Sequence, residues 1–139
     1  MVKCINWLFW IYRWYAYYIN VEDCPPIKPV NISLLEKLLS YTTNPNVAKI
    51  ALTEDLGNRP YHFFDTVDNI EIIEARQGTE YRCSTQYAIW QKNYLLKYLK
   101  PNMTAWQFEI DGSRAALNDG YHIIGTTGTP ERDYVIHSA

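Results

Sequence analysis

Residues 81–115 read YRCSTQYAIWQKNYLLKYLKPNMTAWQFEIDGSRA, and this stretch decides the fold that we expect. From Tyr81 to Trp90 the side chains separate by chemistry at every second position, which predicts a strand. One face of that strand carries Arg82, Ser84, Gln86 and Trp90, and the other carries Tyr81, Cys83, Tyr87 and Ile89. The strand runs directly into a segment with helical spacing.

That segment predicts two helices. From residue 91 to 100, apolar residues recur three and four positions apart, so an amphipathic helix is expected to end before Pro101. Thr104 and Gln107 form a capping-box pattern, which predicts the start of a second helix. One side of this second helix carries Trp106, Glu109, Ser113 and Leu117, although Gly112 weakens its middle.

Outward from this stretch, predicted helices and strands alternate. Ser33 and Glu36 form a capping box for a helix over residues 31–42, which Asn44-Pro45-Asn46 ends. Strands are expected over residues 47–53, 70–75, 121–126 and 133–136, with a proline-rich loop at 21–29 and a polar loop at 55–60. This order predicts an α/β fold in which helices flank a mixed sheet.

Length and charge narrow the class of protein. A chain of 139 residues predicts a single domain, residues 1–139. The net charge of -2 argues against nucleic acid as a partner, because phosphate backbones are bound by clustered positive charge. Cys4, Cys24 and Cys83 are odd in number and widely spaced, so neither a disulfide framework nor a zinc site is indicated, and a reducing cytoplasm fits best.

Aromatic residues gather near the start of the chain, where residues 7–18 read WLFWIYRWYAYY. This run is too short and too polar to span a bilayer, since Asn6 and Arg13 interrupt it. We expect a buried strand pair or an exposed apolar edge here. The alternative is peripheral membrane contact through residues 1–19, with Lys3 and Arg13 facing the headgroups.

The residues best suited to chemistry are Trp106 and Glu109. They lie three positions apart, so on a helix they share a face, and Ser113 continues it. An indole packs against the C–H face of a sugar ring, and a neighbouring carboxylate can accept a hydroxyl proton. The pattern also fits an ordinary helix with one core and one surface residue. The histidines His62, His122 and His137 stand apart in the sequence and predict no metal site.

The order of segments from residue 20 to 126 resembles bacterial and viral glycosyltransferases with the nucleotide-diphospho-sugar transferase (GT-A) fold, of the capsule and surface-polysaccharide type. The segments that carry the likeness are KPVNISLLEKLLSY, NPNVAKIAL, the stretch from Tyr81 to Ala115, and YHIIG. Its most specific piece is WQFEIDGS at 106–113. Residues 1–19 and the tail at 127–139 lie outside the likeness.

The resemblance implies the C-terminal, acceptor-side half of such an enzyme, which transfers a sugar from a nucleotide-diphosphate donor to a surface glycan with inversion. It implies Glu109 as the catalytic base and Trp106 as the sugar platform. Ser113 and Arg114 match the segment that follows, in which the resemblance implies that Arg114 contacts phosphate or the acceptor. The remaining pocket residues that it implies are Gln86, Trp90 and Arg82.

Two departures from the family pattern accompany this likeness. Family members carry an aspartate pair that holds Mg²⁺ or Mn²⁺ against the donor diphosphate, and this sequence has Tyr15-Ala16 at that place. The donor-binding first half of the family has no counterpart before Met1. We therefore expect a truncated or degenerate transferase, or one part of a split enzyme.

Two other functions stay open from the sequence. The first is a non-catalytic carbohydrate- or protein-binding module that uses Trp90, Trp106 and the aromatic N-terminus. The second is a membrane-associated accessory protein, or one that meets a partner chain through residues 1–19.

Overall fold

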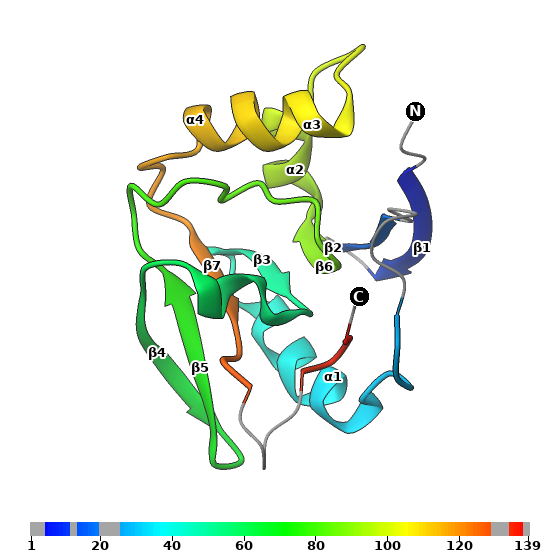
Figure 1. The fold of residues 1–139 in the computed structure, drawn as a ribbon, viewed down its shortest axis with the longest axis vertical. Coiled ribbons are helices and arrows are strands. Elements are labelled where there is room, and N and C mark those ends of the chain that lie inside the picture. Colours follow the sequence, from blue (N-terminus) through cyan, green and yellow to red (C-terminus); the bar gives the residue numbers. More distant parts are fainter. Residues whose placement is uncertain (1–4, 12–13, 20–25, 129–133, 138–139) are drawn as a thin grey trace.

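The computed structural model describes residues 5–11, 14–19, 26–128 and 134–137, and the side chains of the last two of these ranges. Its strands form one mixed sheet in the order β1-β2-β6-β3-β7-β5-β4 (Figure 1). The strands from β6 to β4 form an open sheet, which β2 and β1 extend beyond β6. Helices accompany this sheet, so the expected α/β class with a mixed sheet is confirmed.

The strands are short. Their bounds are β1 Ile5–Ile11, β2 Trp14–Ile19, β3 Val47–Ala51, β4 Tyr61–Val67, β5 Ile70–Ala75, β6 Ala88–Gln91 and β7 His122–Gly125. Paired strands run antiparallel except for β3 and β7, which run parallel. A parallel pair requires a long crossover connection. Here that connection carries the β4–β5 hairpin and most of the helices, and it contains every predicted site residue.

Helices cover both faces of the sheet. Their bounds are α1 Ile32–Leu39, α2 Lys92–Tyr98, α3 Ala105–Gln107 and α4 Ser113–Ala115, with a π-helical turn η3 at Phe108–Gly112 and 3₁₀ turns η1 at Ser40–Thr43 and η2 at Glu54–Asn58. On one face, Leu34 and Leu38 of α1 pack with Ile50 and Ile124. Each such side chain stabilises the fold by roughly 1.5–3 kcal/mol when fully buried.

The other face carries a more aromatic core. Trp90 of β6 packs with Tyr94 of α2 and Phe108 of η3, and Ile123 of β7 belongs to the same buried group. The unit formed by α3, η3 and α4 lies beside α2 (Figure 1). This second core therefore fixes the helices that carry the predicted chemistry to the middle of the sheet.

The helices expected from the sequence are present, with one change of detail. α1 lies within the predicted range 31–42, but its cap is Asn31 rather than Ser33, since Asn31 Oδ1 accepts a hydrogen bond of 3.1 Å from the Leu34 amide. α2 begins at Lys92 and ends before Pro101, as predicted. The predicted strands at 47–53, 70–75 and 121–126 are confirmed as β3, β5 and β7.

The predicted strand from Tyr81 to Trp90 is wrong over most of its length. Only Ala88–Gln91 forms a strand, and residues 81–87 form a turn followed by irregular backbone. Consecutive residues from Arg82 to Thr85 are all buried, which the alternation of a strand does not allow. The backbone leaves the extended region at Tyr81, whose φ is 58°, and the Ser84 amide closes a turn onto the Tyr81 carbonyl at 2.9 Å.

One strand has no counterpart among the elements expected from the sequence, and one expected strand is not confirmed. The segment after the predicted polar loop forms β4, whose side chains are mostly exposed and give a weak apolar signal. Its turn into β5 uses Asp68 and Asn69, both with positive φ, as tight hairpins require. The predicted last strand at 133–136 begins outside the described residues, and residues 134–137 are not a strand, although the Ile136 amide donates to the Leu52 carbonyl at 2.8 Å.

The aromatic N-terminal segment forms an antiparallel strand pair. β1 pairs with β2, and β2 pairs with β6, so the pair lies at one edge of the sheet. The expected strand pair is confirmed for the backbone, whereas Cys4, Glu22, Asp23 and Cys24 lie outside the described residues. No helix in the described ranges is both long and apolar enough to cross a membrane. Contact of residues 1–19 with a membrane or a partner chain stays a prediction.

Candidate functional site

The helical unit that carries Glu109 begins with a two-sided cap. Thr104 Oγ1 accepts a hydrogen bond of 3.1 Å from the Gln107 amide, and Gln107 Oε1 accepts one of 2.8 Å from the Thr104 amide. The predicted capping box is thus confirmed. The helix then widens into the π turn, which contains Gly112. A Cβ at Gly112 would lie 3.1 Å from the Phe108 ring, so the ring packs closely against this glycine.

Residues 79–87, here named the site loop, connect β5 to β6 and contact this helical unit. The Cys83 amide donates to Ser113 Oγ at 2.9 Å, and the Thr85 amide donates to Glu109 Oε1 at 2.7 Å. The Thr85 hydroxyl donates to the same oxygen of Glu109. Buried hydrogen bonds of this kind hold the loop and the helix in a fixed relation.

A buried lysine supports the site loop from the sheet. Lys49 of β3 is almost fully buried, and its Nζ donates to the Ser84 carbonyl at 2.8 Å. The same Nζ lies 4.8 Å from the centre of the Trp90 ring. Burial lowers the pKa of the Lys49 amine, and the negative charges of Asp55 and Glu109 act in the opposite direction. Lys49 therefore belongs to the packing beneath the loop.

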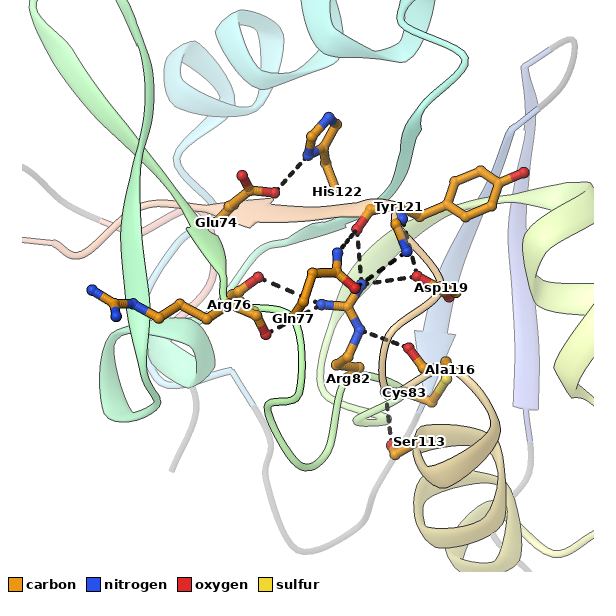
Figure 2. Close-up of polar contacts among 12 residues, drawn as sticks. Glu74, Arg76, Gln77, Arg82, Cys83, Ser113, Ala116, Asp119, Tyr121 and His122 are labelled. Atoms are coloured by element: carbon orange, nitrogen blue, oxygen red, sulfur yellow. Dashed lines mark hydrogen bonds and ion pairs between the residues drawn. The ribbon is translucent and has the colours of Figure 1, made fainter.

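Arg82 is the main anchor of the site loop, as Figure 2 shows. Its side chain has no exposure to solvent. It donates to the carbonyls of Ala116 at 3.0 Å and Tyr121 at 2.8 Å, and to the Asp119 carboxylate at 3.1 Å. Two further carbonyls, those of Ala75 and Arg76, lie at 3.5 Å. In this structure the guanidinium holds the chain together, and its donors are directed at the protein.

A pocket of about 180 Å³ opens between the site loop and the helical unit, and we name it the Glu109 pocket. Its lining residues are Glu80, Tyr81, Glu109, Ile110, Ser113, Arg114 and Leu117. Within the described residues, Glu109 Oε1 is bound by Thr85 while Oε2 has no hydrogen-bond partner. One oxygen thus orients the carboxylate, and the other can accept a proton from a bound group.

The predicted site residues divide between this pocket and the protein interior. Glu109, Ser113 and Arg114 line the Glu109 pocket. Trp90 is 1% exposed and packs against Tyr94 and Phe108. The Trp90 indole is therefore covered by protein. Trp90 and Arg82 both lie in the interior, where they stabilise the fold and do not line the pocket.

Two predicted residues lie near the surface but outside the pocket lining. Trp106 is 67% exposed, one turn before Glu109, and the residues that line the Glu109 pocket do not include it. Gln86 is half-buried, and its amide donates to Ser84 Oγ at 3.3 Å. The indole and the carboxylate thus share a helix without sharing the cavity.

Sequence reasoning missed the residues of the site loop that face the pocket. Tyr81 and Glu80 line it, and Thr85 orients Glu109. The assumed strand placed Tyr81 on a face with Cys83, which hid its role. The left-handed φ of Tyr81 is costly for a bulky residue and is found where surrounding contacts impose it. No residue pattern at 79–87 predicts this backbone conformation.

Two of the histidines that stand apart in the sequence meet at one carboxylate. His62 Nε2 lies 2.6 Å from Glu74 Oε1, and His122 Nδ1 lies 2.6 Å from Glu74 Oε2. The pairing follows from the sheet, since His62 and Glu74 are opposite each other on β4 and β5. Both oxygens of the carboxylate are thereby engaged, and the cluster ties three strands together.

The resemblance implies Mg²⁺ or Mn²⁺, so the residues must be tested for such a site. Among the described residues, no group of three or more His, Cys, Asp or Glu side chains is arranged to hold a metal ion. The positions matched to the family's aspartate pair are Tyr15 and Ala16 of β2, which carry no carboxylate. A site for Mg²⁺ or Mn²⁺ is thus not found within the part of the chain that the structure describes, and the ion stays a prediction.

Comparisons with protein-family models, with curated proteins and with solved structures gave no match to this chain.

Proposed function

We propose that this chain is the acceptor-binding half of a nucleotide-sugar glycosyltransferase of the GT-A type, with Glu109 as its general base. The observation that carries the proposal is the state of the Glu109 carboxylate, which Thr85 fixes through one oxygen beside a pocket. The other oxygen has no partner among the described residues. A base must be both oriented and unoccupied to take a proton.

The reaction that fits this geometry is an inverting displacement. The acceptor hydroxyl oxygen attacks the anomeric carbon of the donor sugar, and its proton passes to Glu109 Oε2. The bond between the anomeric carbon and the phosphate oxygen breaks, and the nucleoside diphosphate leaves with the electron pair. Removal of the proton is needed because a hydroxyl is a weak nucleophile at neutral pH.

The other pocket residues have supporting roles in this proposal. Ser113 lines the pocket, and its Oγ accepts a bond from the Cys83 amide at 2.9 Å, which holds the site loop against the helical unit. The Arg114 side chain is largely exposed and lies 3.9 Å from Asp111, a weak surface pair that a ligand can displace. Trp106 provides an exposed indole beside the pocket for a further part of the glycan.

The pocket limits how much of the acceptor it encloses. Its volume of about 180 Å³ is below the range of about 300–1,000 Å³ that is common for small-molecule sites. It is therefore suited to the reacting end of a glycan, while the rest of the chain lies across the surface. Under this proposal the donor and its metal ligands are supplied from outside the described residues.

The test is the Glu109→Gln substitution, assayed with a panel of nucleotide sugars and surface-type glycans in the presence of manganese. Loss of a general base lowers turnover by about 10² to 10⁴, and glycan binding should be retained because the amide keeps the bond from Thr85. Asp111→Asn is the matched control, because Asp111 is an exposed carboxylate on the same turn that does not line the pocket. Wild-type turnover in Glu109→Gln would remove the mechanism.

A non-catalytic carbohydrate-binding module is the second candidate. It is favoured by Trp106, whose large exposed indole lies outside the pocket that holds the carboxylate. Exposed aromatic side chains of this kind bind sugar rings without any chemistry. Titration of the chain with glycans and with nucleotide sugars separates the two candidates. Glycan binding without donor binding or turnover for any sugar of the panel would favour the module.

A further inference from the structure

A second and larger cavity adjoins the Glu109 pocket. Its volume is about 500 Å³, and its lining residues are Asn58, Arg59, Pro60, Arg76, Gln77, Gly78, Thr79, Glu80 and Tyr81. Glu80 and Tyr81 line both cavities, so the two spaces meet at this pair of residues. We name the second space the arginine cavity. A ligand that reaches Glu109 can therefore extend past Tyr81 into it.

Tyr81 forms a fixed wall between the two spaces. Its φ of 58° places a bulky residue in the left-handed region, and its side chain remains 43% exposed. The guanidinium carbon of Arg59 lies 5.0 Å from the centre of the Tyr81 ring, which holds the ring by a cation–π contact. Strain of this kind persists where the surroundings impose it and is frequent at binding sites.

The two arginines of this cavity differ in what they already bind. Arg59 is paired with Asp55, since its Nη2 lies 2.6 Å from Asp55 Oδ1. Arg76 uses only its Nε, which donates to the Tyr61 carbonyl at 3.2 Å. Within the described residues, the two terminal nitrogens of Arg76 have no hydrogen-bond partner. Figure 2 shows this side chain pointing away from the Arg82 network.

The formal charges in and beside the lining balance, but one cation has terminal donors that no described residue engages. Arg59 and Arg76 are positive and Glu80 is negative, while Asp55 neutralises Arg59 from outside the lining. Arg76 is thus the cation whose planar fork stays available. Such a fork matches the two oxygens of a carboxylate or phosphate, and a hydrogen bond between charged groups is about twice as strong as one between neutral groups.

We propose that the arginine cavity binds a negatively charged group of the same saccharide whose hydroxyl lies at Glu109, which makes the acceptor an acidic glycan. This rests on the proposed function, since it takes the Glu109 pocket as the site of the reacting hydroxyl. The anion is a carboxylate or phosphate on a neighbouring sugar unit. Arg76 binds it, and Tyr81 packs against the linking sugar ring.

Calorimetric titration of the full chain with three probes tests whether the arginine cavity binds an anionic group of the acceptor. The probes are a uronate-containing disaccharide, the same disaccharide with its carboxylate reduced to an alcohol, and uridine diphosphate, which represents the diphosphate of a donor. We expect the acidic disaccharide to bind about tenfold more tightly than the neutral one. Arg76→Gln should remove that preference. Lys28→Gln is the matched control, because Lys28 is an exposed cation that lines neither cavity.

Four outcomes would overturn the proposal. The acidic and neutral disaccharides could bind equally, or the preference could survive in Arg76→Gln, or the substitution could weaken only uridine diphosphate, which would assign the cavity to a donor. Failure to bind any probe would also overturn it. Circular dichroism of Arg76→Gln checks the fold, and Arg76→Lys, which keeps the charge, should restore part of the preference.

This test is separate from that of the catalytic proposal. Binding is measured without turnover, so Glu109→Gln should keep the preference for the acidic disaccharide. If Glu109→Gln keeps full turnover while Arg76→Gln loses the preference, the base is wrong and the anion site stands. If the preference is absent while Glu109→Gln abolishes turnover, the anion site is wrong and the base stands.

Discussion

Cys83 illustrates how one buried residue responds to its surroundings. Its side chain is fully buried, and burial raises the pKa of its thiol from 9.0 to about 11. The thiolate is the reactive form. At pH 8 we therefore expect alkylation of Cys83 to be at least about a hundredfold slower in the folded chain than in guanidinium chloride. Peptide mass spectrometry after iodoacetamide treatment measures this at Cys83 separately from Cys4 and Cys24.

The same pKa difference predicts a change of stability with pH. A group whose pKa is raised on folding contributes stability that is present below its unfolded value and is lost as the pH rises through the folded value. For Cys83 the window is from 9.0 to about 11. Cys83→Ala should lose less stability than the wild type across that window in denaturant titrations. Rapid alkylation of the folded chain at pH 8 would contradict the buried position.

At the level of single residues, the sequence identifies the pocket only in part. The sharing of a helix face correctly groups Glu109 with Ser113, because helix spacing is local. Helix spacing does not predict that the Trp106 indole lies outside the pocket. A wide π turn follows Trp106, and tertiary contacts determine which side chains line the pocket. Trp90 and Arg82 carry groups that suit a binding site, and here both serve the core.

Among the elements, the start of the α3–η3–α4 unit offers a direct test. Thr104→Ala removes the bond from the Gln107 amide to Thr104 Oγ1. Loss of an N-cap costs about 1 kcal/mol in the free energy of unfolding, which thermal and denaturant unfolding can measure. Thr104→Ser should retain wild-type stability because its hydroxyl accepts the same bond. Equal stability of the alanine and serine variants would show that the cap is dispensable.

Elements with strong local signals could be predicted, and those that depend on distant partners could not. α2 follows from its apolar spacing and from Pro101, and the α3 cap from Thr104 and Gln107. The site loop is not predicted, because the alternating chemistry at 81–90 resembles that of a strand. Its buried polar residues are satisfied by Ser113, Glu109 and Asp119, which come later in the chain.

For the whole molecule, the order of the strands is the feature that local patterns do not contain. β3 is paired with β7 across a long crossover, and this pairing brings residue 122 beside residue 47. Glu74 on β5 then lies between His62 on β4 and His122 on β7 and contacts both. No period in the sequence joins these positions, so the mixed sheet was predictable as a class and its topology was not.

The contacts of Arg82 join distant parts of the chain, so its replacement should affect the whole fold. Arg82→Lys keeps a positive charge but has too few donors, in the wrong geometry, for Ala116, Asp119 and Tyr121 together. Each buried acceptor that is left without a donor costs about 1–3 kcal/mol in the free energy of unfolding. Denaturant unfolding measures the loss.

Arg114→Lys is the matched control for Arg82→Lys, since Arg114 is an exposed arginine whose surface pair should matter by no more than about 0.5 kcal/mol. If Arg82→Lys were as stable as this control, the buried guanidinium would not be what holds the site loop against the helical unit. The Glu109 pocket, which lies between the two, would then need a different support. A large loss confined to Arg82→Lys indicates instead that the buried guanidinium stabilises the fold in which the Glu109 pocket lies.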